Sequence, residues 1–267
     1  MSLGSSSPLT SLILPAFNPG AGLETTLARL AEFRVAAAEA WEIILVNDGS
    51  TDGSASRMEQ WARTQGPAVR VLHFEHNHGK GHAVKAGLLA ARGQFRLFTD
   101  IDLAYEFSDI RRVAQTLWSG KPVAIADRSL SGSRLVIPAP LVGYAALRHL
   151  QSTLFHHFTR FLLQLPMGDT QAGLKGLRAD VVADVVPYLE CKGFAFDCEL
   201  LAACARRGWP VASVPVTVRL ESRQSTVRLQ HSWEMVRALL AIRRRWCLTE
   251  PTRPLVAVPQ PLARRAA

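Results

Sequence analysis

The strongest constraint on the fold is the alternation of short apolar runs with segments of helical spacing. The runs are Leu12–Leu14, Ile43–Val46, Val69–Phe74, Phe95–Phe98 and Val123–Ala126. Between the first two, Leu23, Leu27 and Leu30 recur every three or four residues, as on one face of a helix. Strands that alternate with helices are joined by right-handed crossovers and lie parallel. The sequence therefore predicts an α/β fold with a mainly parallel central sheet flanked by helices.

Two carboxylates follow the fourth apolar run, because Asp100 and Asp102 come just after Phe98. In an extended chain, alternate side chains point the same way, so both acids would face one side. Open α/β sheets hold their sites at the carboxyl ends of strands. Mg²⁺ and Mn²⁺ prefer oxygen ligands and complete their shells with water and phosphate oxygens. The pair predicts a divalent-metal site for a diphosphate, and a solvated loop is the alternative.

Two further polar loops follow strands and are expected at the same edge of the sheet. Asp48, in the loop after the second run, can accept hydrogen bonds from a base or a ribose. Gly79 and Gly81 let backbone amides approach a phosphate where a helix begins, and Lys80 can pair with the anion. Each motif alone is also a common turn. The prediction of a binding site therefore depends on the three loops meeting at one edge.

The charge of the chain indicates an anionic partner. Its net charge is +9 and its pI about 10.0, which fits nucleic acid, an anionic membrane face or a phosphorylated ligand. The four cysteines form no C-x-x-C pair, so neither a disulfide framework nor a zinc site is indicated. We expect a cytoplasmic protein without a signal peptide or a membrane-spanning helix.

Much of the basic charge lies at the end of the chain, where ten arginines and three glutamates follow from position 219 onward. Trp233, Leu239 and Trp246 form an apolar side, and Arg237 and Arg243–Arg245 form a basic side. Such an amphipathic helix either docks on an anionic membrane surface or packs on the domain with its basic face in solvent. Residues 249–267 are expected to be a disordered tail.

Several motifs together resemble a known family. The motifs are Pro15-Ala16-Phe17-Asn18, Val46-Asn47-Asp48-Gly49-Ser50-Thr51-Asp52, Gly79-Lys80-Gly81 and Asp100-Ile101-Asp102-Leu103. In this order they resemble the signatures of family 2 glycosyltransferases with the GT-A fold. Asp169–Lys175 and Phe196–Leu201 are similar to the dolichyl- or polyprenyl-phosphate sugar transferases, glucosyl and mannosyl branches alike. The resemblance implies one Rossmann-like GT-A domain over 1–248, with a nucleotide-sugar half (9–128) and an acceptor half (129–248).

The resemblance also implies roles for individual residues. The implied donor-binding residues are Pro15, Phe17, Asn18, Asp48, Gly79, Lys80, Asp100 and Arg219. The implied acceptor-binding residues are Arg128, Arg134, Lys175 and Ser225. The implied catalytic residues are Asp100, Asp102, Arg128 and Asp169. Asp100 and Asp102 are expected to hold Mg²⁺ or Mn²⁺.

The implied activity is a metal-dependent, inverting transfer of glucose or mannose. The donor would be a UDP- or GDP-hexose, and the acceptor a polyprenyl phosphate at the cytoplasmic face of an anionic membrane. A phosphate acceptor is already ionised, whereas a hydroxyl acceptor would need a base, for which Asp169 is the first candidate. Transfer to a soluble acceptor is one alternative. A basic nucleic-acid-binding protein is another, but the arginines gather at the chain end rather than beside stacking aromatics, so no nucleic acid is expected.

Overall fold

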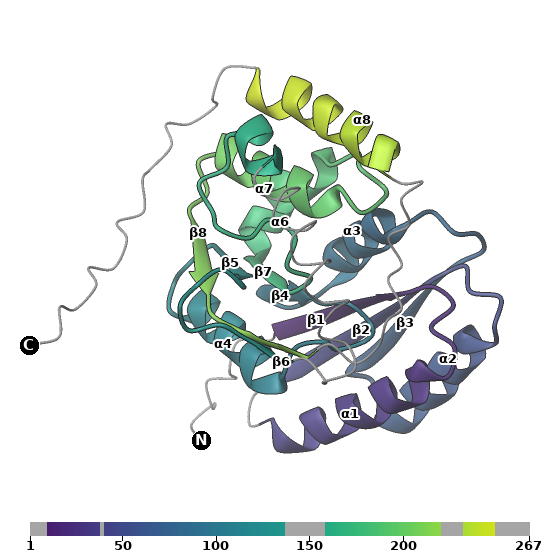
Figure 1. Ribbon diagram of the computed structural model, residues 1–267. Coiled ribbons are helices and arrows are strands. Elements are labelled where there is room, and N and C mark those ends of the chain that lie inside the picture. Colours follow the sequence, from purple (N-terminus) through teal and green to yellow (C-terminus); the bar gives the residue numbers. More distant parts are fainter. Residues whose placement is uncertain (1–9, 38–39, 137–157, 220–231, 249–267) are drawn as a thin grey trace, which may run out of the picture.

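The computed structural model describes residues 10–37, 40–136, 158–219 and 232–248 (Figure 1). The strands are β1 (Thr10–Ala16), β2 (Trp41–Asp48), β3 (Val69–Phe74), β4 (Phe95–Phe98), β5 (Val123–Ala126), β6 (Arg134–Val136), β7 (Lys175–Arg178), β8 (Val211–Val214) and β9 (Thr217–Arg219). The helices are α1 (Gly22–Ala36), α2 (Ser54–Gln65), α3 (Lys80–Ala90), α4 (Phe107–Trp118), α6 (Ala179–Val185), α7 (Phe196–Arg206) and α8 (Ser232–Ile242). A short 3₁₀ turn (Val186–Tyr188) follows α6, and a π-helical turn (Arg243–Cys247) follows α8.

In the described part of the chain, seven strands form the central sheet in the order β3-β2-β1-β4-β7-β5-β8. Every neighbouring pair is parallel except the two that involve β7, which runs antiparallel to both β4 and β5. The predicted α/β fold with a mainly parallel sheet is confirmed. The strand order reverses between β1 and β4, because the chain first builds outward to β3 and then returns. Ligands of open α/β sheets bind beside such a reversal.

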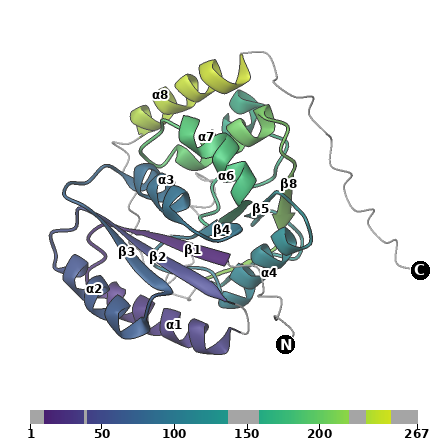
Figure 2. The ribbon, with the colours of Figure 1, turned by 180° about the vertical axis from the view of Figure 1, so that it is seen from behind.

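Two helical layers cover the sheet because its strands are apolar on both faces. Leu12 and Leu14 pack with α1, α2 and α4, whereas Ile13 packs with α3, α6 and α7, as the alternation of side chains in a strand requires. Figure 1 shows α1 and α2 below the sheet and α3, α6 and α7 above it, and Figure 2 shows the same layers from behind. The two layers hold the strands rigid, so the loops at the strand ends are carried on a firm support.

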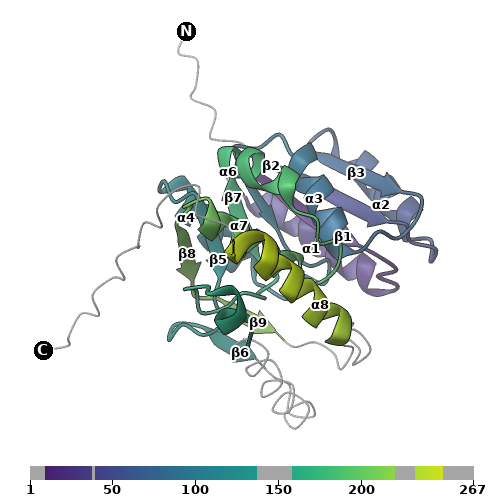
Figure 3. The same cartoon turned by 90° about the horizontal axis from the view of Figure 1, so that it is seen from above.

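A second, two-stranded sheet is formed by β6 and β9, which pair in parallel. Figure 3 shows it apart from the central sheet, near β5 and β8. An antiparallel bridge joins Tyr105 to Val218 of β9. The small sheet is therefore connected to the loop that follows β4.

The end of the described chain packs on the domain. Leu239 and Ile242 of α8 and Trp246 of the π-helical turn are buried in the core above the sheet. The Trp246 indole donates a hydrogen bond to Glu199 Oε1 (3.2 Å), and Arg245 forms an ion pair with the same oxygen (3.0 Å). One arginine of the basic run thus points into the domain, while Arg244 stays exposed. Among the described residues, no helix is long and apolar enough to cross a membrane.

A buried charge stabilises the end of the central sheet at which the parallel strands begin. Glu42 is almost fully buried in β2 and accepts hydrogen bonds from the Ser11 hydroxyl (2.5 Å), the Arg92 amide (2.9 Å) and Arg70 (2.8 Å). Burial alone would raise the pKa of the Glu42 carboxyl, but these three donors lower it below its usual value. A depressed folded pKa means that the stabilisation is complete above the unfolded pKa and is lost as the pH falls.

We therefore expect Glu42→Gln to destabilise the protein by about 2 kcal/mol at pH 7, because a charged acceptor of three donors is lost. The variant should also lose less stability than the wild type as the pH falls below about 4.5. Urea unfolding at a series of pH values measures both effects. Glu59→Gln, which removes an exposed partner of His73, should change stability by about 0.5 kcal/mol or less. Equal losses in the two variants would contradict this account.

Candidate active site

The polar loops predicted from the sequence meet at one edge of the central sheet. The carboxyl ends of β1, β2, β3, β4 and β5 lie at this edge, together with the amino end of the antiparallel β7. We call this edge the rim; it comprises loops 17–21, 49–53, 75–79, 99–106, 127–133 and 166–174. Because Phe98 pairs with Lys175 and Ile125 with the same residue, segment 169–174 runs between the loops after β4 and β5.

The acid pair lies on a tight turn. The Leu103 amide donates to the Asp100 carbonyl (3.1 Å), and Leu103 has a positive φ of 48°. The expectation of an extended chain through Asp100 and Asp102 is therefore wrong, because β4 ends at Phe98 and the backbone reverses at once. The Asp102 carboxylate accepts a hydrogen bond from the Ala104 amide (3.2 Å). The turn, rather than strand alternation, places the two acids at the rim.

Helix α1 holds this turn from below the sheet. The buried Thr26 hydroxyl donates to the Ile101 carbonyl (2.7 Å), and Arg29 donates to the Leu103 carbonyl (3.0 Å). Thr26 and Arg29 are three residues apart on the helix, so their side chains lie on the same face. The position of the acids is therefore determined by a helix more than 70 residues earlier in the chain.

A chain of charged groups runs inward from Asp100. Its Oδ1 lies 2.6 Å from Lys80 Nζ, which is also 3.9 Å from Asp197 Oδ2. Asp197 Oδ1 in turn lies 2.7 Å from Lys175 Nζ. Burial tends to lower the pKa of an ammonium, but the two carboxylates outweigh it and raise the pKa of Lys80. Lys80 is therefore a permanent cation at the rim.

Lys175 and Asp197 lie behind the rim rather than on it. The Lys175 side chain is 0% exposed, and its ammonium donates to the Ala172 carbonyl (2.5 Å) as well as to Asp197. Lys175 is therefore a buried partner of Asp197, and its contact with an acceptor stays a prediction. Asp197 lies in the first turn of α7 but does not cap the helix, because the N-cap is Ala195 and no side chain caps it.

Arg128 and Asp169 form a bidentate ion pair where β5 meets the rim. Arg128 donates from Nε (2.5 Å) and Nη2 (3.0 Å) to the two oxygens of Asp169, and its backbone amide adds a third bond (3.2 Å). Burial tends to raise the pKa of the Asp169 carboxyl, but Arg128 and Lys175 lower it to about 2. A carboxylate with so low a pKa is a weak base, so the arrangement favours Asp169 as the group that orients Arg128.

Tyr105 connects these two charge clusters and was not predicted from the sequence. Its buried hydroxyl accepts a hydrogen bond from the Gly173 amide (3.0 Å). Burial raises the pKa of the Tyr105 phenol, and the charges of Arg128, Asp169 and Asp100 all act on it. Its position three residues after the acid pair, just before a helix, is the only signal in the sequence.

Asp48 holds a neighbouring loop in place. Its carboxylate is 1% exposed and accepts hydrogen bonds from the His78 amide (2.9 Å), the Gly79 amide (2.8 Å) and the Asn77 side chain (3.1 Å). These donors close the loop that leads into Lys80. The structure thus places Asp48 as a support of the loop before α3, and its contact with a nucleoside stays a prediction.

The other predicted residues lie in several separate places. The Asn18 side chain accepts from the Thr51 amide (2.8 Å), which joins the loops after β1 and β2, and half-exposed Phe17 lies beside it. Pro15 is buried within β1. Arg134 is exposed at the start of β6. The backbone of Arg219 ends β9, whereas its side chain and Ser225 lie outside the described residues.

The space around Asp100 suits a divalent cation that is shared with a diphosphate. A side chain at position 173 would collide with Asp100 Oδ2, so glycine there lets this carboxylate keep its present position. Among the described residues, no group of three or more His, Cys, Asp or Glu side chains forms a complete metal cage. Mg²⁺ and Mn²⁺ need no such cage, since one or two carboxylates with water and substrate phosphates suffice. Asp100 and Asp102 thus fit the oxygen-ligand chemistry of these ions.

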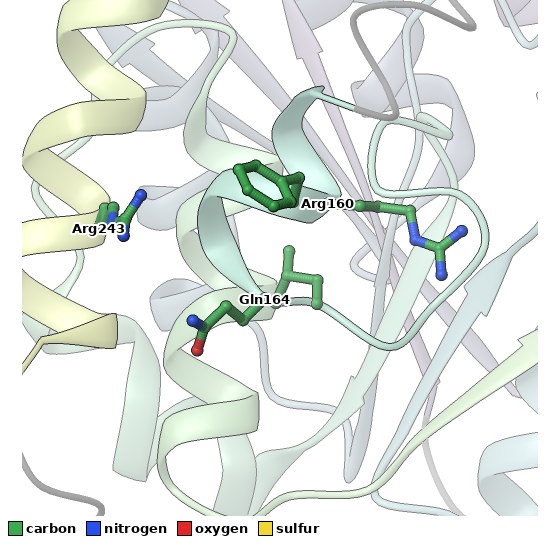
Figure 4. Close-up of a pocket in the computed structure, with 5 residues that line it drawn as sticks. Arg160, Gln164 and Arg243 are labelled. Carbon is green, nitrogen blue, oxygen red and sulfur yellow. The ribbon is translucent and has the colours of Figure 1, made fainter.

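A hollow of about 520 Å³ lies elsewhere, between the helical segment 158–163 and the turn after α8. It is lined by Arg160, Phe161, Gln164, Leu165 and Arg243. Figure 4 shows Arg160 and Arg243 on opposite sides of Gln164. No rim residue lines this hollow, so it is separate from the acid pair.

Comparison with known proteins identifies the class. The sequence profile described as "Glycosyl transferase family 2" matches residues 11–186. The chain belongs to this family of glycosyltransferases. It is 29% identical over 244 residues to the dolichyl-phosphate beta-glucosyltransferase of Dictyostelium discoideum, with 89% of this chain and 75% of that protein covered. The dolichyl-phosphate beta-glucosyltransferase ALG5C of Trichomonas vaginalis is 32% identical over 218 residues, covering 78% of this chain and 63% of that protein.

Solved structures share the fold. Glucosyl-3-phosphoglycerate synthase from Mycobacterium tuberculosis, in complex with Mn²⁺, UDP and glucosyl-3-phosphoglycerate, has a TM-score of 0.60 at 17% identity, covering 91% of this chain and 81% of that one. The same enzyme with Mn²⁺, UDP-glucose and phosphoglyceric acid has a TM-score of 0.61 at 18% identity, covering 90% and 80%. The GT-A class predicted for the fold agrees with these neighbours.

We expect Gly173→Ala to weaken Mn²⁺ binding by about tenfold or more, because the new methyl group displaces the Asp100 carboxylate. Folding should be retained, since a single carboxylate can rotate away. Isothermal titration with Mn²⁺ measures the change. Gly193→Ala is the matched control, because a methyl group there meets nothing within 4 Å. Unchanged affinity in Gly173→Ala would show that Asp100 takes no part in metal binding.

Proposed function

We propose that the protein transfers a hexose from a nucleoside diphosphate to a polyprenyl phosphate, with a divalent metal at Asp100 and Asp102. The observation that carries this proposal is the acid turn beside the sheet's strand reversal, with Lys80 on Asp100 and Gly173 leaving room for its carboxylate. The names of the relatives favour glucose and dolichyl-type phosphate, and the neighbouring structures were solved with UDP. UDP-glucose is therefore the first donor to test, and a GDP-hexose is the second.

On the donor side, the rim supplies charge where the leaving group develops it. The metal, when bound, stabilises the negative charge that grows on the departing diphosphate. Lys80, a permanent cation, lies beside the same position. The start of α3, whose N-cap Gly79 has a φ of 97°, adds the positive end of a helix. The loops after β1 and β2, joined through Asn18 and Thr51, form the wall expected to meet the nucleoside.

On the acceptor side, Arg128 is the group that we assign to the phosphate. Two of its five N–H donors bind Asp169, and the side chain remains 41% exposed, so further donors are available at the rim. Asp169 holds the guanidinium plane in one orientation. An ionised phosphate needs no general base, which agrees with the low pKa of Asp169, about 2. Arg134, on β6, is the second arginine expected to attract the acceptor.

The face around α8 is our candidate for contact with an anionic membrane. Leu240 and Leu248 are exposed there, as is Phe161, whose exposed fraction is 82%. The arginines Arg160 and Arg243 line the adjoining hollow. Apolar and basic side chains together suit an anionic lipid surface, at about 1 kcal/mol for each basic residue near it. This would place the enzyme at the cytoplasmic side of a membrane without a spanning segment in the described residues.

Asp100→Asn and Asp102→Asn should each reduce transfer from UDP-glucose by about 100-fold or more, since a metal contributes several kcal/mol to the transition state. Initial rates with Mg²⁺ or Mn²⁺ and polyprenyl phosphate measure the loss. Asp180→Asn alters an exposed acid on α6, paired with Arg178, and should leave the rate unchanged. Full activity in both rim variants would refute the metal assignment.

Arg128→Lys should raise the KM for polyprenyl phosphate by about tenfold, because lysine cannot make the bidentate pair and reach a phosphate as well. Arg178→Lys is a matched control, since Arg178 also forms a bidentate pair, with Asp180, but at the other edge of the sheet. Rates with polyprenol and with 3-phosphoglycerate complete the test. Turnover with 3-phosphoglycerate but not with the lipid phosphate would favour a soluble acceptor.

A further inference from the structure

Lys80 lies on the carboxylate that we assign to the metal. Its ammonium is 2.6 Å from Asp100 Oδ1, a distance at which a charge-assisted hydrogen bond is strong. A divalent ion on the same carboxylate would stand a few ångströms from a positive ammonium, and like charges at that separation repel. A divalent metal at this site and Lys80 would therefore both need the Asp100 carboxylate.

A second carboxylate is available to the same ammonium. Asp197 Oδ2 lies 3.9 Å from Lys80 Nζ, and Asp197 is nearly fully buried. The other Asp197 oxygen is held by the fully buried Lys175, so this acid cannot follow a ligand outward. Lys80 thus has a near partner at the rim and a farther one that is anchored in the core.

The backbone at Lys80 is not free to move with its side chain. A methyl group at Gly79 would collide with the Lys192 carbonyl, and one at Gly81 would collide with the Cys191 carbonyl. The His82 amide donates to the same Lys192 carbonyl (3.2 Å). The backbone at the start of α3 therefore packs closely against segment 191–193. Lys80 can exchange one carboxylate partner for the other only by rotating its side chain.

We infer that Lys80 is an internal cation that competes with the divalent metal for Asp100 and passes to Asp197 when the metal binds. The inference rests on the proposed function, since it requires the metal at Asp100. Without metal, Lys80 neutralises the acid and holds it in place. With metal, the ammonium is released from Asp100 but stays at the rim, held by the anchored Asp197. Lys80 is thus a positioning residue for Asp100 that also weakens metal binding in the absence of donor.

Competition of this kind has a predictable size. If the Lys80–Asp100 pair is closed nine-tenths of the time, the apparent affinity for metal is lowered about tenfold relative to an open site. Lys80→Met removes the competitor and retains much of the side-chain volume. We therefore expect the full-length Lys80→Met protein to bind Mn²⁺ about tenfold more tightly than the wild type, although it loses a cation that the donor would use.

The test is a titration of each protein with Mn²⁺ alone, in which the free ion is followed by electron paramagnetic resonance. Lys85→Met is the matched control, because it removes the same charge from the same helix. The Lys85 ammonium donates to the Pro187 and Leu189 carbonyls and to neither acid. Thermal melts in a chelator confirm that each variant is folded, and Lys80→Gln serves if Lys80→Met is not.

The outcomes separate this inference from the proposed function. Tighter Mn²⁺ binding in the Lys80 variant, with the Lys85 variant like the wild type, supports the competition. Equal or weaker binding in the Lys80 variant overturns it while leaving the metal site intact. An equal gain in both variants also overturns it, since the effect would then be the net charge of the helix. If neither the wild type nor the Lys80 variant binds Mn²⁺, the metal site of the proposed function is refuted, and the competition with it.

Discussion

Charge matching at the rim is the constraint on which the rest of the site depends. Three carboxylates at the rim or just behind it each form a close ion pair with a cation. The pairs are Asp100 with Lys80, Asp169 with Arg128 and Asp197 with Lys175. An unpaired buried charge costs several kcal/mol, so removal of one member leaves a penalty rather than a neutral gap. Each of these three pairs is neutral, and a divalent cation together with a diphosphate can join them as a nearly balanced pair.

One reversed strand creates this arrangement. Because β7 runs antiparallel between β4 and β5, the segment before it reaches the rim between Asp100 and Arg128. That segment supplies Asp169 to Arg128 and places Gly173 against Asp100, and β7 itself begins with the buried Lys175. Were β7 parallel, its amino end would lie at the opposite edge, and these contacts would be lost. The donor and acceptor sides of the site are joined by this strand.

Much of this architecture was predictable from the sequence. The limits of β3, β4 and β5 agree with the predicted apolar runs, and the three polar loops after β2, β3 and β4 meet as expected. These features follow from local patterns of two to eight residues. The rim position of Lys80 beside Asp100 also agrees with the charge argument, although the sequence predicted a bound anion as its partner.

What the sequence did not predict depends on contacts between distant segments. Asp48 lies in a loop whose sequence is typical of ligand binding. Its carboxylate, however, accepts hydrogen bonds from backbone amides about 30 residues later in the chain. A lysine such as Lys175 is expected at the protein surface. It is buried because β7, which begins with it, lies in the middle of the sheet. Asp197 lies at the start of a helix, yet its nearest partner is Lys175, 22 residues earlier. Tyr105 carries no local signal at all, because its role arises only when Gly173 is brought beside it.

The most direct measurement of the central claim is a crystal structure of the protein with Mn²⁺ and UDP. The account predicts Mn²⁺ bound by the Asp100 carboxylate and the diphosphate, with Lys80 no longer on Asp100. A structure with UDP and Mn²⁺ bound elsewhere, and with the Lys80–Asp100 pair unchanged at 2.6 Å, would contradict it.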